Sequence, residues 1–172
     1  YHNCLLVEFC HGDWRPTIVR QFLFDTYNYF FYTALLSSAD ERLKEVAHKA
    51  IKEVTYHAQW SAEWVIRLGD GTEESHHRVQ ESLDDLWEWT GELFDMDEVD
   101  QAMLEAGIGV DLKAIKEQWD QKVSEILDIA TLKRPEDAWH QTGGKQGEHS
   151  EYLGYVLAEM QHLPRMYPEA EW

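Results

Sequence analysis

The sequence predicts an all-α fold built as a helical bundle. Apolar residues recur three and four positions apart through several long segments, helix-capping residues precede those segments, and the sustained alternation of a strand is absent. The chain has 172 residues, of which 44% are hydrophobic and 13% aromatic. Because that is enough to build one helical core, we expect a single domain over residues 1–172.

The first two helices are predicted at residues 14–36 and 40–68. Asp13 is placed to cap the first helix, Pro16 is tolerated in its first turn, and most of its second half is apolar. The second helix keeps the three-four apolar spacing of a bundle helix and stops at the glycine-bearing residues 69–71.

A third helix is predicted from Thr72 to about Phe94, because two early glutamates suit the positive end of a helix and an apolar stripe continues beyond them. A short acidic segment follows at residues 97–106. Asp111 is then placed to cap a fourth long helix that runs to about Ala130.

Residues 131–150 break the helical pattern with one proline and three glycines, so we expect a loop there. Around Lys145 the loop lacks the order Gly-x-x-x-x-Gly-Lys-Ser/Thr and no strand precedes it, so ATP binding is not supported. Contact with a phosphate and a plain interface loop remain as alternatives. A final helix over residues 153–163 is expected to end at Pro164.

The formal net charge of −18 at pH 7 excludes several kinds of partner. It repels a phosphate backbone, so we expect no nucleic acid, and it disfavours anionic membranes. No apolar run approaches the roughly 20 residues that span a bilayer, so no membrane segment is expected. Cys4 and Cys10 are the only cysteines and make no disulfide framework, which predicts reduced thiols and a cytoplasmic location.

Metal-binding bundles carry Glu-x-x-His pairs and further carboxylates that point inward from facing helices. The sequence has five Glu-x-x-His spacings, and projecting the side chains around the predicted helices at about 100° per residue supports none of them as a metal site. One pair precedes the first helix, and three pairs face solvent. The fifth lies in the first turn of a helix, where the helix dipole already explains its glutamate. These pairs are Glu8/His11, Glu45/His48, Glu74/His77, Glu159/His162 and, in the first turn, Glu73/His76.

Three other residues are predicted to face the core: Asp25 on the first helix, and Glu53 and His57 four positions apart on the second. One interpretation is a buried polar network in which they satisfy one another. The other is a metal site, since ligands at i and i+4 can share a metal. A di-iron centre needs about four carboxylates and two histidines, so we expect only a vestigial site here, with no catalytic residue, metal or cofactor in this chain.

Three stretches resemble the C-subunit family of the bacterial phenylacetyl-CoA epoxygenase (ring 1,2-phenylacetyl-CoA monooxygenase), a family of phenylacetate degradation proteins. They occur in the family's order across nearly the whole chain, up to the closing Trp172. The stretches are Ala-Ile-Lys-Glu-Val-Thr-Tyr-His at 50–57 with Arg-Leu-Gly-Asp-Gly-Thr at 67–72, Leu-Trp-Glu-Trp-Thr-Gly-Glu-Leu-Phe at 86–94, and Thr-Gly-Gly-Lys at 142–145 continuing through His149, Glu151 and Leu153-Gly154 to Glu159-Met160-Gln161.

This resemblance implies a ferritin-like, non-catalytic structural subunit of a multicomponent di-iron oxygenase that epoxidises phenylacetyl-CoA in aerobic phenylacetate catabolism. The implied partners are a ferritin-like catalytic A subunit, which carries the di-iron centre and the substrate, and other components including a reductase. Val54 stands where a Glu-x-x-His pair ending at His57 would need its carboxylate, which agrees with a degraded metal site.

The resemblance also implies that the N-terminal helices of the family's bundle are absent from this chain. We therefore expect a truncated bundle whose aromatic face, from Phe22 to Leu36, is exposed unless a missing segment or a partner covers it. Two alternatives stay open: a metal-binding catalytic oxygenase subunit whose other ligands lie outside the chain, and a ferritin-like protein that assembles with itself.

Overall fold

A computed structural model describes residues 1–9 and 13–171 of the chain. All regular structure in these residues is helical, which confirms the predicted all-α class. The elements, in chain order, are η1 (Leu5–Glu8), α1 (Trp14–Leu35), α2 (Glu41–Gly69), α3 (Glu73–Trp87), η2 (Gly91–Phe94), α4 (Glu98–Glu105), α5 (Leu112–Ile129), η3 (Gly144–Gln146) and α6 (Glu151–Met166).

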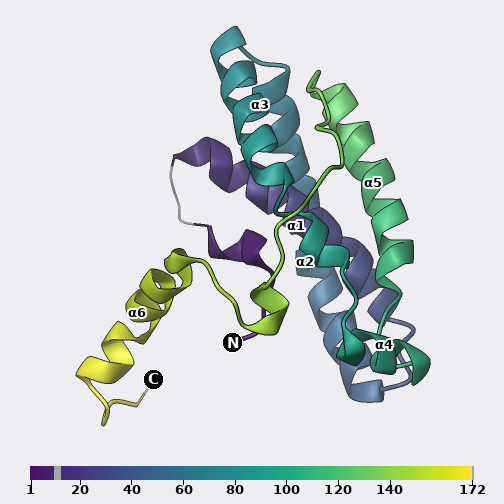
Figure 1. Cartoon of the computed structure of the whole chain (residues 1–172), viewed down its shortest axis with the longest axis vertical. Helices are drawn as coiled ribbons and strands as arrows, with labels where there is room; N and C mark the ends of the chain where they lie inside the picture. Colours follow the sequence, from purple (N-terminus) through teal and green to yellow (C-terminus); the bar gives the residue numbers. More distant parts are fainter. Residues whose placement is uncertain (10–12, 172) are drawn as a thin grey trace.

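Helix α1 is the central element of the bundle. It packs against α2, α3 and α5, and η1 also contacts it (Figure 1). Its sequence is apolar around most of the circumference, as expected of a helix with neighbours on several sides. The prediction of an exposed aromatic face is therefore wrong for Phe22, which is only 1% exposed, because α3 and α5 also pack against α1.

The predicted N-caps Asp13 and Asp111 are confirmed, and Asp40 and Thr72, which were predicted as helix starts, also cap their helices. Each capping side chain accepts at least one backbone N–H from the first turn, which satisfies donors that have no partner within the helix. These residues are Asp13 before α1, Asp40 before α2, Thr72 before α3 and Asp111 before α5.

Two predicted helix ends are wrong. Helix α3 ends at Trp87 rather than near Phe94, because the chain turns at Thr90, whose hydroxyl donates to the Trp87 carbonyl at 2.8 Å, and then enters η2. Helix α6 continues past Pro164 to Met166. Pro164 lies inside the last turn, and the bond from the Tyr167 N–H to the Leu163 carbonyl closes the helix after it.

Helix α6 stands apart from the bundle in Figure 1. It contacts η1, and none of its residues is buried. The segment at 131–150 that leads to it is irregular apart from η3, as predicted. None of the helices in the described ranges is long and apolar enough to cross a bilayer.

Candidate functional site

Asp25 faces the interior of the bundle, as predicted. Its side chain lies on α1 and the residue is 3% exposed. Gln21, one turn earlier, donates its Nε2 to Asp25 Oδ1 at 2.6 Å, whereas Asp25 Oδ2 is buried and has no hydrogen-bond partner among the described residues. Burial raises the pKa of the Asp25 carboxyl, and this effect outweighs the opposing effects of the Gln21, Ser61 and His57 side chains, which lower it.

A cavity of about 330 Å³ lies beside Asp25. Asp25 and His57 both line it, so the structure brings together two of the three predicted residues, although His57 is exposed at its mouth. The prediction that Glu53 and His57 face the core is wrong, because both residues are exposed, and Glu53 does not line this cavity. A helical projection gives the angle of a residue around α2, but it does not show which sectors of the helix a neighbour covers. The full lining is Trp14, Thr17, Ile18, Gln21, Asp25, His57 and Trp60.

The residues around this cavity do not fit a di-iron centre. Such a centre takes about four carboxylates and two histidines from facing helices. In residues 1–9 and 13–171, no group of three or more His, Cys, Asp or Glu side chains is arranged to hold a metal ion. The vestigial character of the site remains a prediction.

Most of the rejected Glu-x-x-His pairs face solvent, as predicted. The pairs at 45/48, 74/77 and 159/162 have both side chains exposed. His76 is only half-buried, and its Nδ1 lies 2.7 Å from the Gly69 carbonyl, where it joins the end of α2 to α3.

His11, Cys10 and Trp172 lie outside the described residues. Cys4 is a free thiol, and burial raises its pKa to about 11.

The sequence interpretation missed a buried carboxylate at Glu92, which is 1% exposed. It accepts backbone N–H groups from Leu5 at 2.7 Å, Gly143 at 2.9 Å and Lys145 at 3.3 Å. One side chain of η2 therefore holds both the N-terminal segment and the glycine loop. Since three charge-assisted hydrogen bonds satisfy it, its role in this arrangement is structural.

Glu8 is a second buried carboxylate that the sequence did not reveal, and it is 2% exposed. Ser150 donates its N–H and its hydroxyl to Glu8 Oε2, both at 2.8 Å, while His149 Nδ1 lies 2.6 Å and Asn3 Nδ2 3.0 Å from Oε1. Burial by itself raises the pKa of Glu8, but the hydrogen bonds from Ser150, His149 and Asn3 together lower it. No local signal reveals this role, because two of the partners are 141 and 142 residues away.

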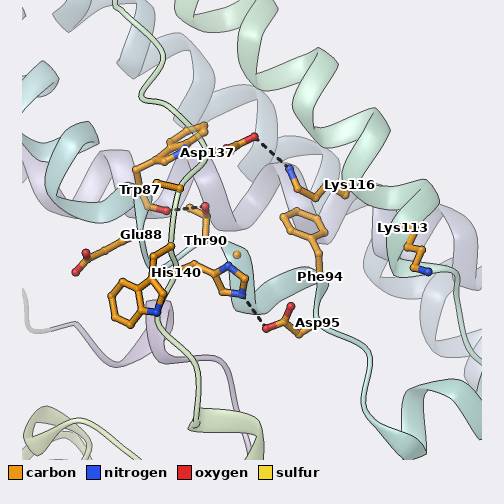
Figure 2. A pocket seen from close by; sticks show the side chains of 12 residues that line it. Trp87, Glu88, Thr90, Phe94, Asp95, Lys113, Lys116, Asp137 and His140 are labelled. Carbon is orange, nitrogen blue, oxygen red and sulfur yellow. Dashed lines mark hydrogen bonds and ion pairs between the residues drawn. The ribbon is translucent and has the colours of Figure 1, made fainter.

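A second cavity, of about 210 Å³, lies where the loop at residues 137–140 passes over η2 and α5 (Figure 2). Four of its charged groups form two pairs: His140 Nε2 lies 3.0 Å from Asp95, and Lys116 Nζ lies 3.8 Å from Asp137. A side chain at Gly91 would overlap the His140 ring. The loop at 137–140 therefore packs against the Trp-Glu-Trp-Thr-Gly stretch at 87–91.

The glycine loop at residues 143–147 is packed against the N-terminal segment. A Cβ at Gly144 would overlap the Asn3 carbonyl oxygen, so only glycine allows this approach. Lys145 Nζ donates to the Asp95 carbonyl at 2.6 Å and pairs with Asp100 at 3.0 Å. Because acidic partners already hold its ammonium group, these contacts favour the interface-loop interpretation over a phosphate contact.

Comparison with known proteins shows the family. The whole chain, residues 1–172, matches the family described as phenylacetic acid catabolic protein. It is 42% identical over 172 residues to the C subunit of the 1,2-phenylacetyl-CoA epoxidase of Escherichia coli (strain K12), an alignment that covers 100% of this chain and 69% of that protein. The chain therefore belongs to the phenylacetic acid catabolic protein family, which confirms the resemblance and the ferritin-like class.

Proposed function

We propose that this chain is a C subunit of a phenylacetyl-CoA epoxidase and acts as a structural, non-catalytic component of that oxygenase in phenylacetate catabolism. One observation carries the proposal: 42% identity, sustained over the entire chain, to an E. coli protein named as that subunit. A protein named as a subunit works within a complex, so this chain functions together with partner subunits.

The chemistry of the buried acidic residues supports a structural role. Glu8 and Glu92 are occupied by hydrogen bonds that fasten the N-terminal segment and the glycine loop. Asp25 and His57 share a cavity, but a di-iron centre requires about six ligands. The reaction centre is accordingly assigned to a ferritin-like A subunit, which binds the iron and the substrate while a reductase supplies electrons.

The test is co-expression of this chain with its A subunit. We expect a stable complex that co-purifies through a tag on either chain, with iron in proportion to the A subunit alone. About two iron atoms per copy of this chain, lost in the Asp25→Asn and His57→Ala variants, would instead establish a catalytic di-iron subunit. Light scattering separates the third possibility, because a self-assembling ferritin-like protein forms a homo-oligomer without any partner.

A further inference from the structure

We propose that the cavity beside Asp25 binds a primary ammonium group, a site that does not depend on iron or on the epoxidase assignment. The carboxylate is the starting point. Asp25 is only 3% exposed, its Oδ1 is bound by Gln21, and its Oδ2 has no partner. A buried carboxylate oxygen without a donor is costly, and a cation that reaches it removes that cost.

Two polar side chains of the lining leave acceptor atoms free beside Asp25. Gln21 uses its Nε2 on Asp25, which leaves its carbonyl oxygen, and Thr17 donates its hydroxyl hydrogen to the Asp13 carbonyl at 3.1 Å, which leaves its lone pairs. No Lys or Arg of the described residues lines the cavity. The N–H donors of the lining are those of the His57, Trp14 and Trp60 rings, and none of these is a permanent cation. An ammonium group supplies the missing positive charge together with three donors and no acceptor.

The apolar walls suit the cation and its alkyl chain. The rings of Trp14 and Trp60 meet edge to face with centroids 5.8 Å apart, and Ile18 adds an aliphatic side chain to the lining. Indole faces attract ammonium groups, and they also pack against methylene groups. A ligand that is anionic would meet Asp25 with the same charge and is excluded.

Size and access agree with a small ligand. A volume of about 330 Å³ exceeds the roughly 30 Å³ of one water and falls at the lower end of ligand pockets. Trp14 is 48% exposed and His57 is also exposed, so the cavity opens to solvent. The net charge of −18 further attracts cations to the chain.

The experiment titrates the purified chain with n-butylammonium and, in parallel, with butyrate, and follows tryptophan fluorescence and the NMR signal of the Asp25 carboxyl carbon. We expect saturable binding of butylammonium and no binding of butyrate. Asp25→Asn should weaken butylammonium binding by at least about tenfold, because it removes the charge and keeps the shape. Glu53→Gln is the matched control, since it neutralises an exposed carboxylate outside the cavity and should leave binding unchanged.

Trp60→Leu is a second variant, in case Asp25→Asn does not fold, and it should weaken binding several-fold in the NMR titration. Comparable binding of butyrate, unchanged affinity in Asp25→Asn or in Trp60→Leu, or no saturable response in the native chain overturns the proposal. A lysine-containing peptide distinguishes the two sources of such a group. Tighter binding of the peptide than of butylammonium indicates a lysine of another polypeptide, and the reverse indicates a free amine.

Discussion

Glu92 Oε1 accepts the backbone N–H of Gly143 at 2.9 Å, although the two residues are 51 positions apart in the chain. The second carboxylate oxygen accepts the N–H of Leu5 at 2.7 Å. Three segments that have no regular pairing with one another are thus joined at a single buried side chain. The loop at 137–140 beside the cavity of Figure 2 leads into the glycine loop that this junction holds.

Glu92→Gln should therefore destabilise the chain. The substitution replaces one acceptor oxygen with an NH2 group that faces backbone N–H donors, so at least one buried donor loses its partner. We expect the free energy of unfolding in urea to fall by about 1–3 kcal/mol. Glu117→Gln, the same change at an exposed position of α5, should alter it by less than about 0.5 kcal/mol, and equal losses in both variants would refute the role of Glu92.

Gly91→Ala should also destabilise the chain, by about 1–3 kcal/mol, because the added methyl group overlaps the ring of His140. Gly154 in α6 is a matched control, since a Cβ there meets nothing within 4 Å. Gly154→Ala should stabilise the chain by about 0.5–1 kcal/mol through helix propensity. A His140→Gly background removes both the ring and the His140 Cβ, which would lie 2.6 Å from the added methyl group, so the cost of Gly91→Ala should largely vanish there. A persistent cost would mean that the overlap with His140 is not its cause.

The parts of the fold that the sequence predicted correctly depend on local signals. Asp13, Asp40, Thr72 and Asp111 mark helix starts because a cap requires only a side chain and the backbone next to it. The end of α3 was mispredicted because the apolar stripe continues to Phe94, while the turn at Thr90 and Gly91 is stabilised by a loop about 50 residues further on.

In the candidate site, too, the residues predicted correctly are those that a local signal reveals. Asp25 was recognised because a charged residue stands inside the apolar sector of a helix. Glu8 and Glu92 were not, because a glutamate in a short irregular segment is indistinguishable from a surface residue until its distant donors are known. Glu53 was misplaced because it lies at a flank of α2 that the described elements leave open.

Glu8 predicts a loss of stability in acid. The pKa of Glu8 is lowered in the folded chain, so its contribution is fully present above the unfolded value of about 4.3 and disappears as the pH falls through the folded value. Glu8→Gln should remove part of the difference in free energy of unfolding between pH 6 and pH 3. Hydrogen exchange of the Ser150 amide, which donates to Glu8 at 2.8 Å, should become faster in this variant at pH 6. An unchanged exchange rate would show that Glu8 does not fasten the start of α6.

Asp25 predicts the opposite dependence on pH. The pKa of Asp25 is raised, so the folded chain binds more protons than the unfolded chain between about pH 4 and the folded value, and stability falls as the pH rises through that interval. Asp25→Asn should remove this fall and should raise the free energy of unfolding at pH 7 by about 1 kcal/mol or more, because no buried charge remains. Urea titrations of both forms at pH 4 and pH 7 test the sign. Greater stability of the native chain at pH 7 would contradict it.

Trp119 is a large, fully buried side chain in the centre of the bundle, and its replacement should be far more costly than that of an exposed tryptophan. It is 1% exposed, its Nε1 donates to the Leu23 carbonyl at 2.9 Å, and its ring lies 5.3 Å from that of Phe94. Trp119→Phe removes this hydrogen bond and leaves a gap, so we expect a loss of about 2–4 kcal/mol in the free energy of unfolding. Trp139, which is 69% exposed and belongs to the lining of the 210 Å³ cavity, provides the control, because Trp139→Phe should change stability by less than about 0.5 kcal/mol. If the two variants unfold at the same urea concentration, the packing of α5 on α1 through Trp119 does not stabilise the bundle.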